Sequence, residues 1–164
     1  AELASLKAIL EKKGKVIYIA PLKALASEKF ADFKNRYRGI IKVALSMGDI
    51  DSDDSYLAGY DMIICTAEKL DSLIRHGCPW LGAIRVIVID EIHTLNDTQR
   101  GPVLEILITM LRGIVSSAQI LGLSATIGNP DELAEWLHAS LVIDDWRPVR
   151  LYKGIYLDGE VELV

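Results

Sequence analysis

The sequence predicts an α/β fold built on a parallel sheet, and two observations lead to this prediction. Four short apolar runs rich in Ile and Val recur along the chain, and stretches with helical spacing lie between them. The runs are nearly continuous rather than alternating, as in parallel strands that helices cover on both faces. Strands that alternate with helices form βαβ units, so we expect a parallel sheet flanked by helices.

Each of the four apolar runs is short enough to be one buried strand. They are KVIYIA at 15–20, DMIIC at 61–65, RVIVID at 85–90 and QILGLS at 119–124. Two weaker runs are candidates for a fifth and a sixth strand, IIKVAL at 40–45 and SLVID at 140–144.

Helical patterns fill the segments between the strands. Apolar residues recur at three- and four-residue spacing through 22–37, and a shorter apolar face covers 70–74. The segment 101–113 is apolar nearly all round, so it is either deeply buried or meets a partner surface.

The last part of the chain has a helix start signal and then changes character. In NPDELAEWL, 129–137, Asn129 is placed as the N-cap, and Glu132 follows it three residues later. After DDWRPVR, 144–150, Gly154 and Gly159 punctuate strand-like runs. This end of the chain predicts a hairpin or the entry to another domain.

Composition places the chain among packed globular domains. It has 164 residues, of which 51% are apolar and 25% charged. No apolar run approaches the roughly 20 residues of a membrane span, and the start has no signal-peptide layout. Cys65 and Cys78 lie in or beside apolar segments, which favours reduced and buried thiols in a cytoplasmic protein. The Cys and His residues lack zinc-ligand spacing.

Charge is unevenly distributed along the chain. The net charge of −5 argues weakly against nucleic-acid binding. However, residues 1–42 carry ten Lys/Arg against four Asp/Glu, a net of +6, whereas residues 43–164 carry a net of −11. This asymmetry permits a basic face, with a solvated helix surface as the alternative explanation.

Polar residues follow each of the four strands, at the sheet edge where open α/β folds bind ligands. They are Pro21-Leu22-Lys23-Ala24-Leu25, Thr66-Ala67-Glu68-Lys69, Glu91-Ile92-His93 and Ser124-Ala125-Thr126. Four such tips along one edge indicate a site that binds phosphates or a metal ion. Each tip alone has a plainer explanation, because Ser and Thr commonly cap helices and a lysine such as Lys69 is commonly solvated.

The tip after 85–90 has the chemistry of a hydrolytic centre. Asp90 would hold Mg²⁺ through water, as a strand-end Asp does in P-loop NTPases. Glu91 would orient or deprotonate an attacking water, and His93 could sense a nucleotide and hydrogen-bond to a neighbouring tip. The alternative is an acidic helix N-terminus that only complements the helix dipole.

This ordered set of tips resembles the superfamily 2 helicases of the DExH-box kind. PLKAL is similar to their motif Ia, TAEKL to motif Ib, DEIH to motif II and SAT to motif III. GDIDSDD at 48–54, QRGPVLEILI and LSATIGNPDELAEWL resemble the superkiller-like branch, and within it the archaeal Hjm-type DNA repair helicases. DWRPVRLYKGIY is similar to that group's segment leaving the first motor domain, so the resemblance covers essentially the whole chain.

The resemblance implies a RecA-like first motor domain at 1–146 and an exit segment at 147–164. ATP hydrolysis with Mg²⁺ would occur against a second such domain and drive translocation on single-stranded or forked DNA. By motif match, the magnesium and water-activating acids would be Asp90 and Glu91, and the coupling residues His93, Ser124, Ala125 and Thr126. The nucleic-acid track would hold Pro21, Lys23, Ala24, Gly48, Thr66 and Lys69, mostly against phosphates and sugars.

The family's phosphate-binding loop is the main departure from this resemblance. The sequence has no Gly-x-x-x-x-Gly-Lys-Ser/Thr, and Lys13-Gly14-Lys15 is no substitute because Val16 follows it in place of a hydroxyl. We therefore expect an incomplete RecA-like sheet without its P-loop strand. Such a fragment alone should neither hydrolyse ATP nor unwind DNA. Its exposed strand edges could also lead to self-association. An RNA-remodelling helicase of the same branch and a non-catalytic nucleic-acid-binding module remain alternatives.

Overall fold

A five-stranded parallel sheet forms the centre of residues 1–127. The structure is a computed structural model that describes residues 1–11, 14–48, 54–125, 127–144, 146, 148–149, 152 and 154–163. The chain divides into two compact units, Ala1–Ile127 and Gly128–Val164, and each is described by itself. The domain boundary expected at 146 stays a prediction.

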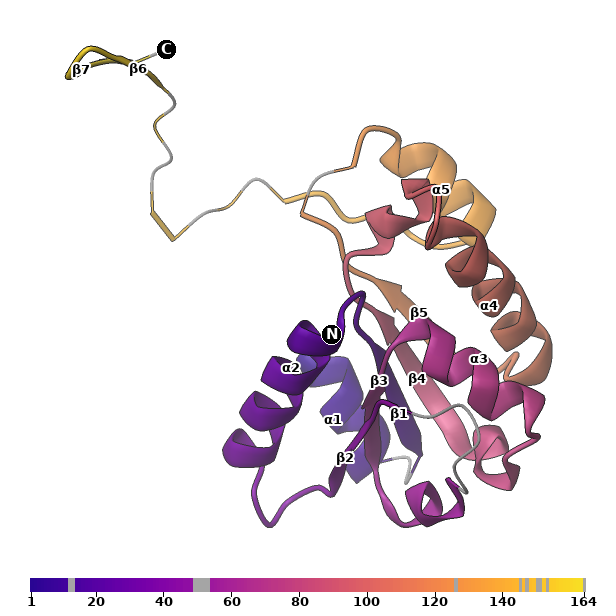
Figure 1. The fold of residues 1–164 in the computed structure, drawn as a ribbon. Coiled ribbons are helices and arrows are strands. Elements are labelled where there is room, and N and C mark those ends of the chain that lie inside the picture. The colour runs from indigo at the N-terminus through magenta and orange to yellow at the C-terminus, as the bar shows by residue number, and fades with distance from the viewer. Residues whose placement is uncertain are drawn as a thin grey trace. The chain divides into compact units, whose positions relative to one another are not determined.

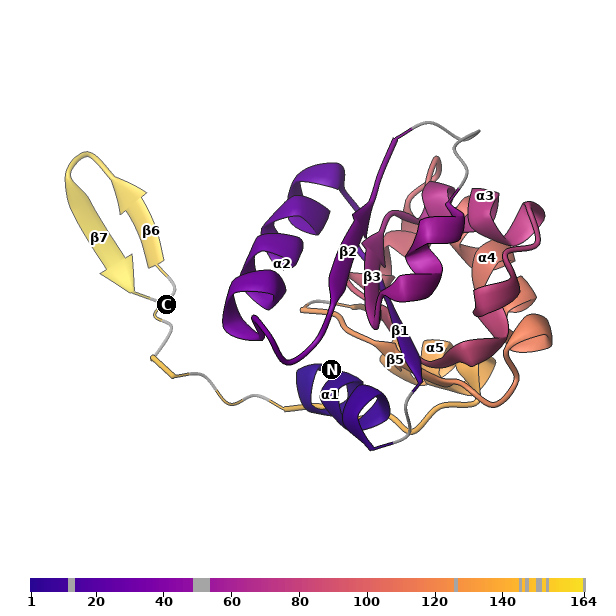
Figure 2. The same ribbon diagram turned by 90° about the horizontal axis from the view of Figure 1, so that it is seen from below.

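The strand order confirms the predicted parallel sheet. The strands are β1 (Lys15–Ile19), β2 (Val43–Ser46), β3 (Met62–Cys65), β4 (Ile84–Ile89) and β5 (Gln119–Gly122). They lie in the order β2-β3-β1-β4-β5, and every neighbouring pair is parallel. Figure 2 shows β2, β3 and β1 side by side. β1 and β4, which carry the tips with the most chemistry, are therefore adjacent and central.

The predicted sixth strand at 140–144 is wrong. These residues form no strand, and Val142 is 86% exposed. An apolar run becomes a strand only where a neighbour accepts its backbone hydrogen bonds, and sequence composition does not reveal the neighbour. The weaker candidate at 40–45 does contain a strand, β2, which pairs with β3.

Helices cover both faces of the sheet, as Figure 1 shows, with α1 and α2 on one side and α3 and α4 on the other. Their bounds are α1 (Glu2–Leu10), α2 (Lys23–Arg36), α3 (Ala67–Arg75) and α4 (Gly101–Ile114), with short 3₁₀ turns η1 (Ser55–Gly59), η2 (Pro79–Ala83) and η3 (Ile92–Asn96). The helices predicted within 22–37, 70–74 and 101–113 are thus confirmed. α4 buries one side and leaves Ile106 and Ile114 exposed on the other.

Side-chain alternation along the strands builds a core on each face. Val16, Tyr18 and Ala20 belong to the cluster that packs under α1 and α2. Ile17 and Ile19 alternate to the opposite face and are fully or almost fully buried. The central strand is therefore covered on both sides, which explains its continuous apolar sequence.

The second unit contains helix α5 (Pro130–Leu137) and a hairpin of β6 (Gly154–Leu157) and β7 (Glu160–Leu163). Asn129 is the N-cap residue of α5, but its side chain donates to the Glu132 carboxylate at 2.8 Å instead of accepting from the backbone. Asp158 and Gly159 both have positive φ, as a two-residue hairpin turn requires. The predicted hairpin is confirmed. No helix among the described residues is long and apolar enough to span a membrane.

Candidate active site

The end of β4 delivers the two adjacent acids to the carboxyl edge of the sheet. The Asp90 N–H still donates to the carbonyl of Ile19 at 2.9 Å, so the parallel ladder continues for one residue past the strand. Glu91 then adopts a left-handed backbone conformation, with φ 51° and ψ 50°. This conformation costs a non-glycine residue about 1–2 kcal/mol and turns Glu91 out of the strand direction. Asp90 therefore belongs to the strand and Glu91 to the turn, as the sequence predicts.

The carboxylate of Asp90 is held by hydrogen bonds at both oxygens. The hydroxyl of Tyr18, on β1, donates to Oδ2 at 2.6 Å, and the Glu91 N–H donates to Oδ1 at 3.1 Å. Burial raises the pKa of the Tyr18 phenol far above its ordinary value, and the hydrogen bond to Asp90 raises it further. Tyr18 is therefore protonated and acts as the donor.

His93 connects the acid turn to the end of β5. Its Nδ1 lies 3.1 Å from the hydroxyl of Ser124 and 3.3 Å from the carboxylate of Glu91. The contact with Glu91 is an ion pair when the imidazole is protonated. The side chains of His93 and Glu91 are 34% and 39% exposed, so both are open to a ligand as well as to each other. One imidazole nitrogen thus lies within reach of both the candidate base and the predicted coupling serine.

A pocket lies beside Asp90 at the same edge of the sheet. It is lined by residues from the ends of β1 and β4, the start of α3, η3 and α4: Ile19, Ala20, Pro21, Ala67, Glu68, Ile89, Asp90, Thr94, Arg100 and Leu104. Arg100 donates to the carbonyl of Pro21 at 3.4 Å. Its turn is fixed by Asp97, whose carboxylate accepts the N–H groups of Gln99 and Arg100, and these bonds lower the pKa of Asp97. Pro21 from the tip after β1 and Ala67 and Glu68 from the tip after β3 therefore border one pocket together with Asp90.

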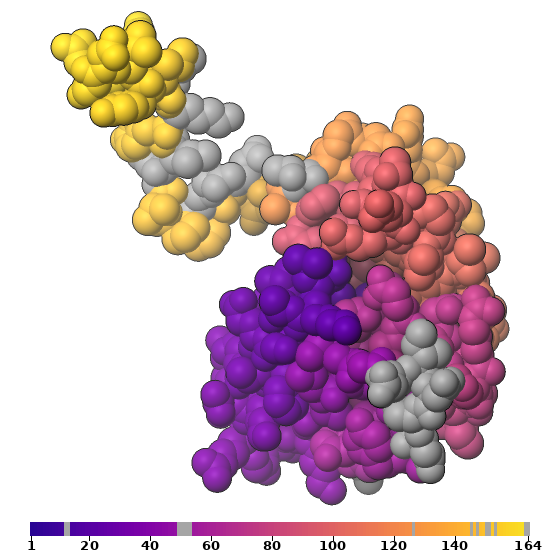
Figure 3. All heavy atoms as spheres, in the orientation of Figure 1, coloured from indigo at the N-terminus to yellow at the C-terminus, as the bar shows by residue number. Residues whose placement is uncertain are grey.

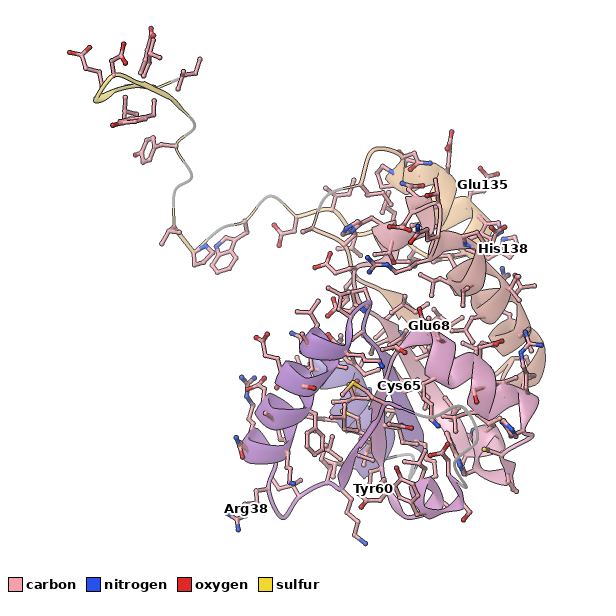
Figure 4. The ribbon with its side chains drawn as sticks, viewed as in Figure 1. Arg38, Tyr60, Cys65, Glu68, Glu135 and His138 are labelled. Atoms are coloured by element: carbon pink, nitrogen blue, oxygen red, sulfur yellow. The ribbon has the colours of Figure 1, made fainter. Side chains whose placement is uncertain are left out.

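The tip after β1 is open to solvent. Pro21 is half-buried, whereas Lys23 and Ala24 are exposed at the first turn of α2. α2 then runs away from this edge. Figure 4 shows Arg38, which follows α2, at the end of the sheet opposite Cys65 and Glu68. Only part of the basic excess in residues 1–42 is therefore near the candidate site.

The tip after β3 differs from the sequence-based expectation. Thr66 caps α3, and its side-chain oxygen accepts the Lys69 N–H at 3.5 Å. Lys69 is neither solvated nor displayed toward a ligand, because it is 5% exposed and its ammonium lies 2.7 Å from the carboxylate of Asp54. The Lys69 ammonium forms a buried ion pair, so the proposed nucleic-acid-binding residues do not include Lys69.

The remaining predicted residues lie at the ends of β2 and β5. Gly48 is exposed with φ 122°, a conformation that favours glycine, and the rest of GDIDSDD up to residue 53 lies outside the described residues. Ser124 and Ala125 are exposed after β5. Thr126 lies outside the described residues. η3 and the start of α4, coral in Figure 3, form part of the molecular surface, in keeping with the exposure of Gln99 and Arg100.

The donor set fits a magnesium ion better than a metal that needs a protein cage. The described residues contain no group of three or more His, Cys, Asp or Glu side chains that could hold a metal ion. Among the described residues, each Asp90 oxygen accepts one protein hydrogen bond, which leaves a further lone pair on each oxygen for a ligand. Mg²⁺ is commonly bound by one or two carboxylates, its own waters and substrate phosphates, so Asp90 is a suitable ligand. The sequence has no P-loop to supply the phosphate donors.

Two residues near the site were missed by the sequence analysis. Tyr18 places a hydroxyl in an otherwise aliphatic buried strand, and that polar atom needs a partner, which was an available signal. Arg100 is the last residue of an Asp-x-x-Arg turn. This turn predicts a capped helix start, but it does not predict the contact with Pro21. The distance in sequence between Arg100 and Pro21 conceals that contact.

Comparison with known proteins agrees with this arrangement. The family model for the DEAD/DEAH box helicases matches residues 1–133. The chain belongs to the DEAD/DEAH box helicase family. Residues 90–93, Asp-Glu-Ile-His, lie within the matched range. The predicted resemblance to DExH-box helicases and the predicted α/β fold are confirmed.

Curated relatives place the chain more narrowly. It is 55% identical over 161 residues to the ATP-dependent DNA helicase Hel308 of Pyrococcus abyssi, covering 98% of this chain and 22% of the relative. It is 57% identical over 154 residues to Hel308 of Methanocaldococcus jannaschii, covering 93% of this chain and 12% of the relative. It is also 49% identical to Hel308 of Caldivirga maquilingensis over its full 164 residues, 22% of that protein. The chain thus spans less than a quarter of these helicases.

Proposed function

We propose that this chain is the motif Ia-to-III part of the first motor domain of an ATP-dependent DNA helicase, with the domain at 1–146 and an exit segment at 147–164. The longer protein would couple ATP hydrolysis to translocation on single-stranded DNA and to unwinding of forked duplexes. It would work in the cytoplasm, and in association with the nucleoid if the organism is prokaryotic. The observation that carries the proposal is the acid turn at the end of β4, joined through His93 to the end of β5.

The two acids divide the hydrolytic work. Bound Mg²⁺ would neutralise phosphate charge and orient the nucleotide. Asp90 is suited to hold that ion because its carboxylate is fixed at both oxygens and keeps free lone pairs. Glu91, turned out of the strand and 39% exposed, is suited to orient or deprotonate the attacking water.

Coupling between hydrolysis and movement would pass through His93. The Nδ1 atom of His93 lies near both the Glu91 carboxylate and the Ser124 hydroxyl. Movement of Glu91 during hydrolysis would therefore alter the hydrogen bond between His93 and Ser124. Ser124, Ala125 and Thr126 would transmit this change, together with a second motor domain elsewhere in the longer protein. The 3.1 Å hydrogen bond between His93 and Ser124, which are 31 positions apart in the sequence, supports this link.

The nucleic-acid track would follow the carboxyl edge of the sheet. Lys23 and Ala24 are exposed there, Pro21 borders the pocket, and Gly48 is exposed at the end of β2. Thr66 is mainly a helix cap, so it would contribute through the backbone at the start of α3. Contacts of this kind address phosphates and sugars, so binding should be independent of sequence and sensitive to salt.

An RNA-remodelling helicase of the same branch is the second candidate. The relatives at 49–57% identity, each named a DNA helicase, favour DNA. The test is to measure ATP turnover of the full-length protein with single-stranded DNA and with RNA of the same sequence. Stimulation by DNA at least tenfold above that by RNA supports the proposal, and the reverse preference contradicts it.

The 164-residue chain alone should bind and hydrolyse ATP poorly, because its sequence has no phosphate-binding loop. Robust DNA-stimulated turnover by the chain itself would contradict this assignment and favour a self-sufficient module. β5 is an edge strand with half-buried Ile120 and Leu121, which supports the expected self-association. Light scattering across a concentration series measures it.

A further inference from the structure

Strand register brings Tyr18 and Asp90 to the same face of the sheet. Tyr18 on β1 is paired with Val88 on β4, and Asp90 lies two residues beyond Val88. Residues two apart on a strand share a face and are about 6.6 Å apart along it. A tyrosine can bridge that distance from the neighbouring strand with its ring among apolar groups and its hydroxyl at the sheet edge. The 2.6 Å bond to Oδ2 is the result.

The ring of Tyr18 is fixed by its surroundings. Tyr18 is 4% exposed, within the cluster that packs under α1 and α2. Its ring lies 5.9 Å from the ring of Phe33, at an interplanar angle of 59°. Phe33 in turn lies 6.0 Å from Tyr37. A hydroxyl carried by a ring held in this way has little freedom to leave its acceptor.

The two hydrogen bonds on Asp90 together define its carboxylate. The Tyr18 hydroxyl holds Oδ2 from the core side, and the Glu91 N–H holds Oδ1 from the turn. Without the first bond, the half-buried carboxylate would keep one donor among the described residues, the N–H of neighbouring Glu91, and could rotate about its terminal torsion. Precise ligand placement in metal sites depends on such supporting hydrogen bonds.

We propose that Tyr18 is a positioning residue for the magnesium site, whose hydroxyl fixes the Asp90 carboxylate so that one lone pair on each oxygen is presented to the ion or its waters. This inference rests on the proposed function, which assigns Asp90 to Mg²⁺. Tyr18 itself touches neither nucleotide nor metal. Its effect should therefore appear in the affinity for the metal before it appears in the rate at saturating metal.

The test is Tyr18→Phe in the full-length protein. This change keeps the ring packing against Phe33 and removes only the donor to Asp90. We expect the Mg²⁺ concentration for half-maximal ATP turnover to rise roughly tenfold, the factor expected for one hydrogen bond to a charged group. Turnover at saturating Mg²⁺ should fall by less. Mn²⁺ binding in the presence of a non-hydrolysable ATP analogue, followed by electron paramagnetic resonance, should weaken by a similar factor.

Tyr37→Phe is the matched control. Tyr37 stands in the same aromatic stack and its hydroxyl also donates to a carboxylate, that of Glu2, but it does not contact Asp90. The hydrogen bond to Tyr37 lowers the pKa of Glu2, so this control also removes a bond to a charged acceptor. It reports how the loss of a phenol–carboxylate bond between α1 and the end of α2 affects the whole fold.

A metal requirement that rises in Tyr18→Phe and stays at the wild-type value in Tyr37→Phe supports the inference. Equal rises in both variants, or unchanged Mg²⁺ and Mn²⁺ affinity in Tyr18→Phe, overturn it while leaving the proposed function intact. Wild-type protein whose ATP turnover is independent of Mg²⁺ overturns both.

Discussion

The tips after β4 and after β3 look alike in sequence and differ in the structure. Each follows a buried parallel strand and carries acidic and other polar residues within four positions. After β4, Glu91 is strained into a left-handed conformation, and its side chain and that of His93 are each more than a third exposed. After β3, Thr66 caps a helix and Lys69 is buried in an ion pair with Asp54. The first tip leaves an acid and an imidazole accessible, whereas Thr66 and Lys69 of the second tip stabilise the fold.

The difference shows how a functional tip is recognised. After β3, Thr66 and Lys69 have partners inside the domain, whereas Glu68 is exposed and lines the pocket beside Asp90. The group after β4 combines exposure, backbone strain and a carboxylate with spare lone pairs, and proteins tolerate such strain mainly where function requires it. Position at the carboxyl edge is therefore necessary for a site residue, but it is not sufficient.

The largest expected effect on stability is that of Lys69→Met. This change removes the cation that lies 2.7 Å from the Asp54 carboxylate in a pair that is almost fully buried. Breaking a buried pair from one side costs about 3–5 kcal/mol, and we expect this loss in the free energy of unfolding of the chain. Urea denaturation followed by circular dichroism measures it.

Two companions sharpen this prediction. The double variant Lys69→Met/Asp54→Leu should recover most of the loss, because an apolar pair replaces both charges. Lys23→Met, at an exposed lysine, should change the free energy of unfolding by less than about 0.5 kcal/mol and instead weaken DNA binding by the full-length protein. If Lys69→Met weakens DNA binding without destabilising the chain, the tip after β3 is a ligand site after all.

A smaller effect is expected from Thr66→Ala, which removes the cap of α3. The loss of one N-cap hydrogen bond should lower the free energy of unfolding by about 1 kcal/mol. Asn129→Ala is the matched change at the N-cap of α5, where the side chain makes no cap bond to the backbone. It should cost less than Thr66→Ala in the same denaturation experiment. Equal losses in the two variants would show that the Thr66 cap hydrogen bond does not stabilise the fold.

The smallest effect is a difference in thiol reactivity. Cys65 ends β3 directly before Thr66, and burial raises its pKa to about 12, so little thiolate forms at neutral pH. Cys78 is half-buried. In the native chain at pH 8, iodoacetamide should modify Cys78 well before Cys65, and mass spectrometry of peptides measures both rates. Comparable rates would mean that the tip after β3 opens readily.

Much of the fold was predictable from the sequence because strands and helices leave periodic patterns. The apolar runs predicted β1, β3, β4 and β5, and spacing predicted the helices between them. The strand predicted at 140–144 is absent because these residues pair with no strand among those that the structure describes. A pattern describes what a segment can bury, whereas pairing depends on another part of the chain.

The candidate site was less predictable, because its decisive contacts join residues far apart in sequence. The positions of Asp90 and Glu91 followed from the strand that precedes them. The partner of Lys69 was not predictable, since Asp54 lies 15 positions away and many exposed residues could have taken its place. The bond from Tyr18 to Asp90 spans 72 positions and depends on the register of two strands.

The most direct test of the central claim is Glu91→Gln in the full-length protein, with turnover and nucleotide binding measured on the same preparation. Glutamine keeps the shape of the side chain and removes the base. We expect DNA-stimulated ATP turnover to fall by about 10²–10⁴-fold, the usual contribution of a general base, while ATP affinity changes by less than about threefold. Near-normal turnover in this variant would contradict the assignment of the acid turn after β4 as the hydrolytic centre.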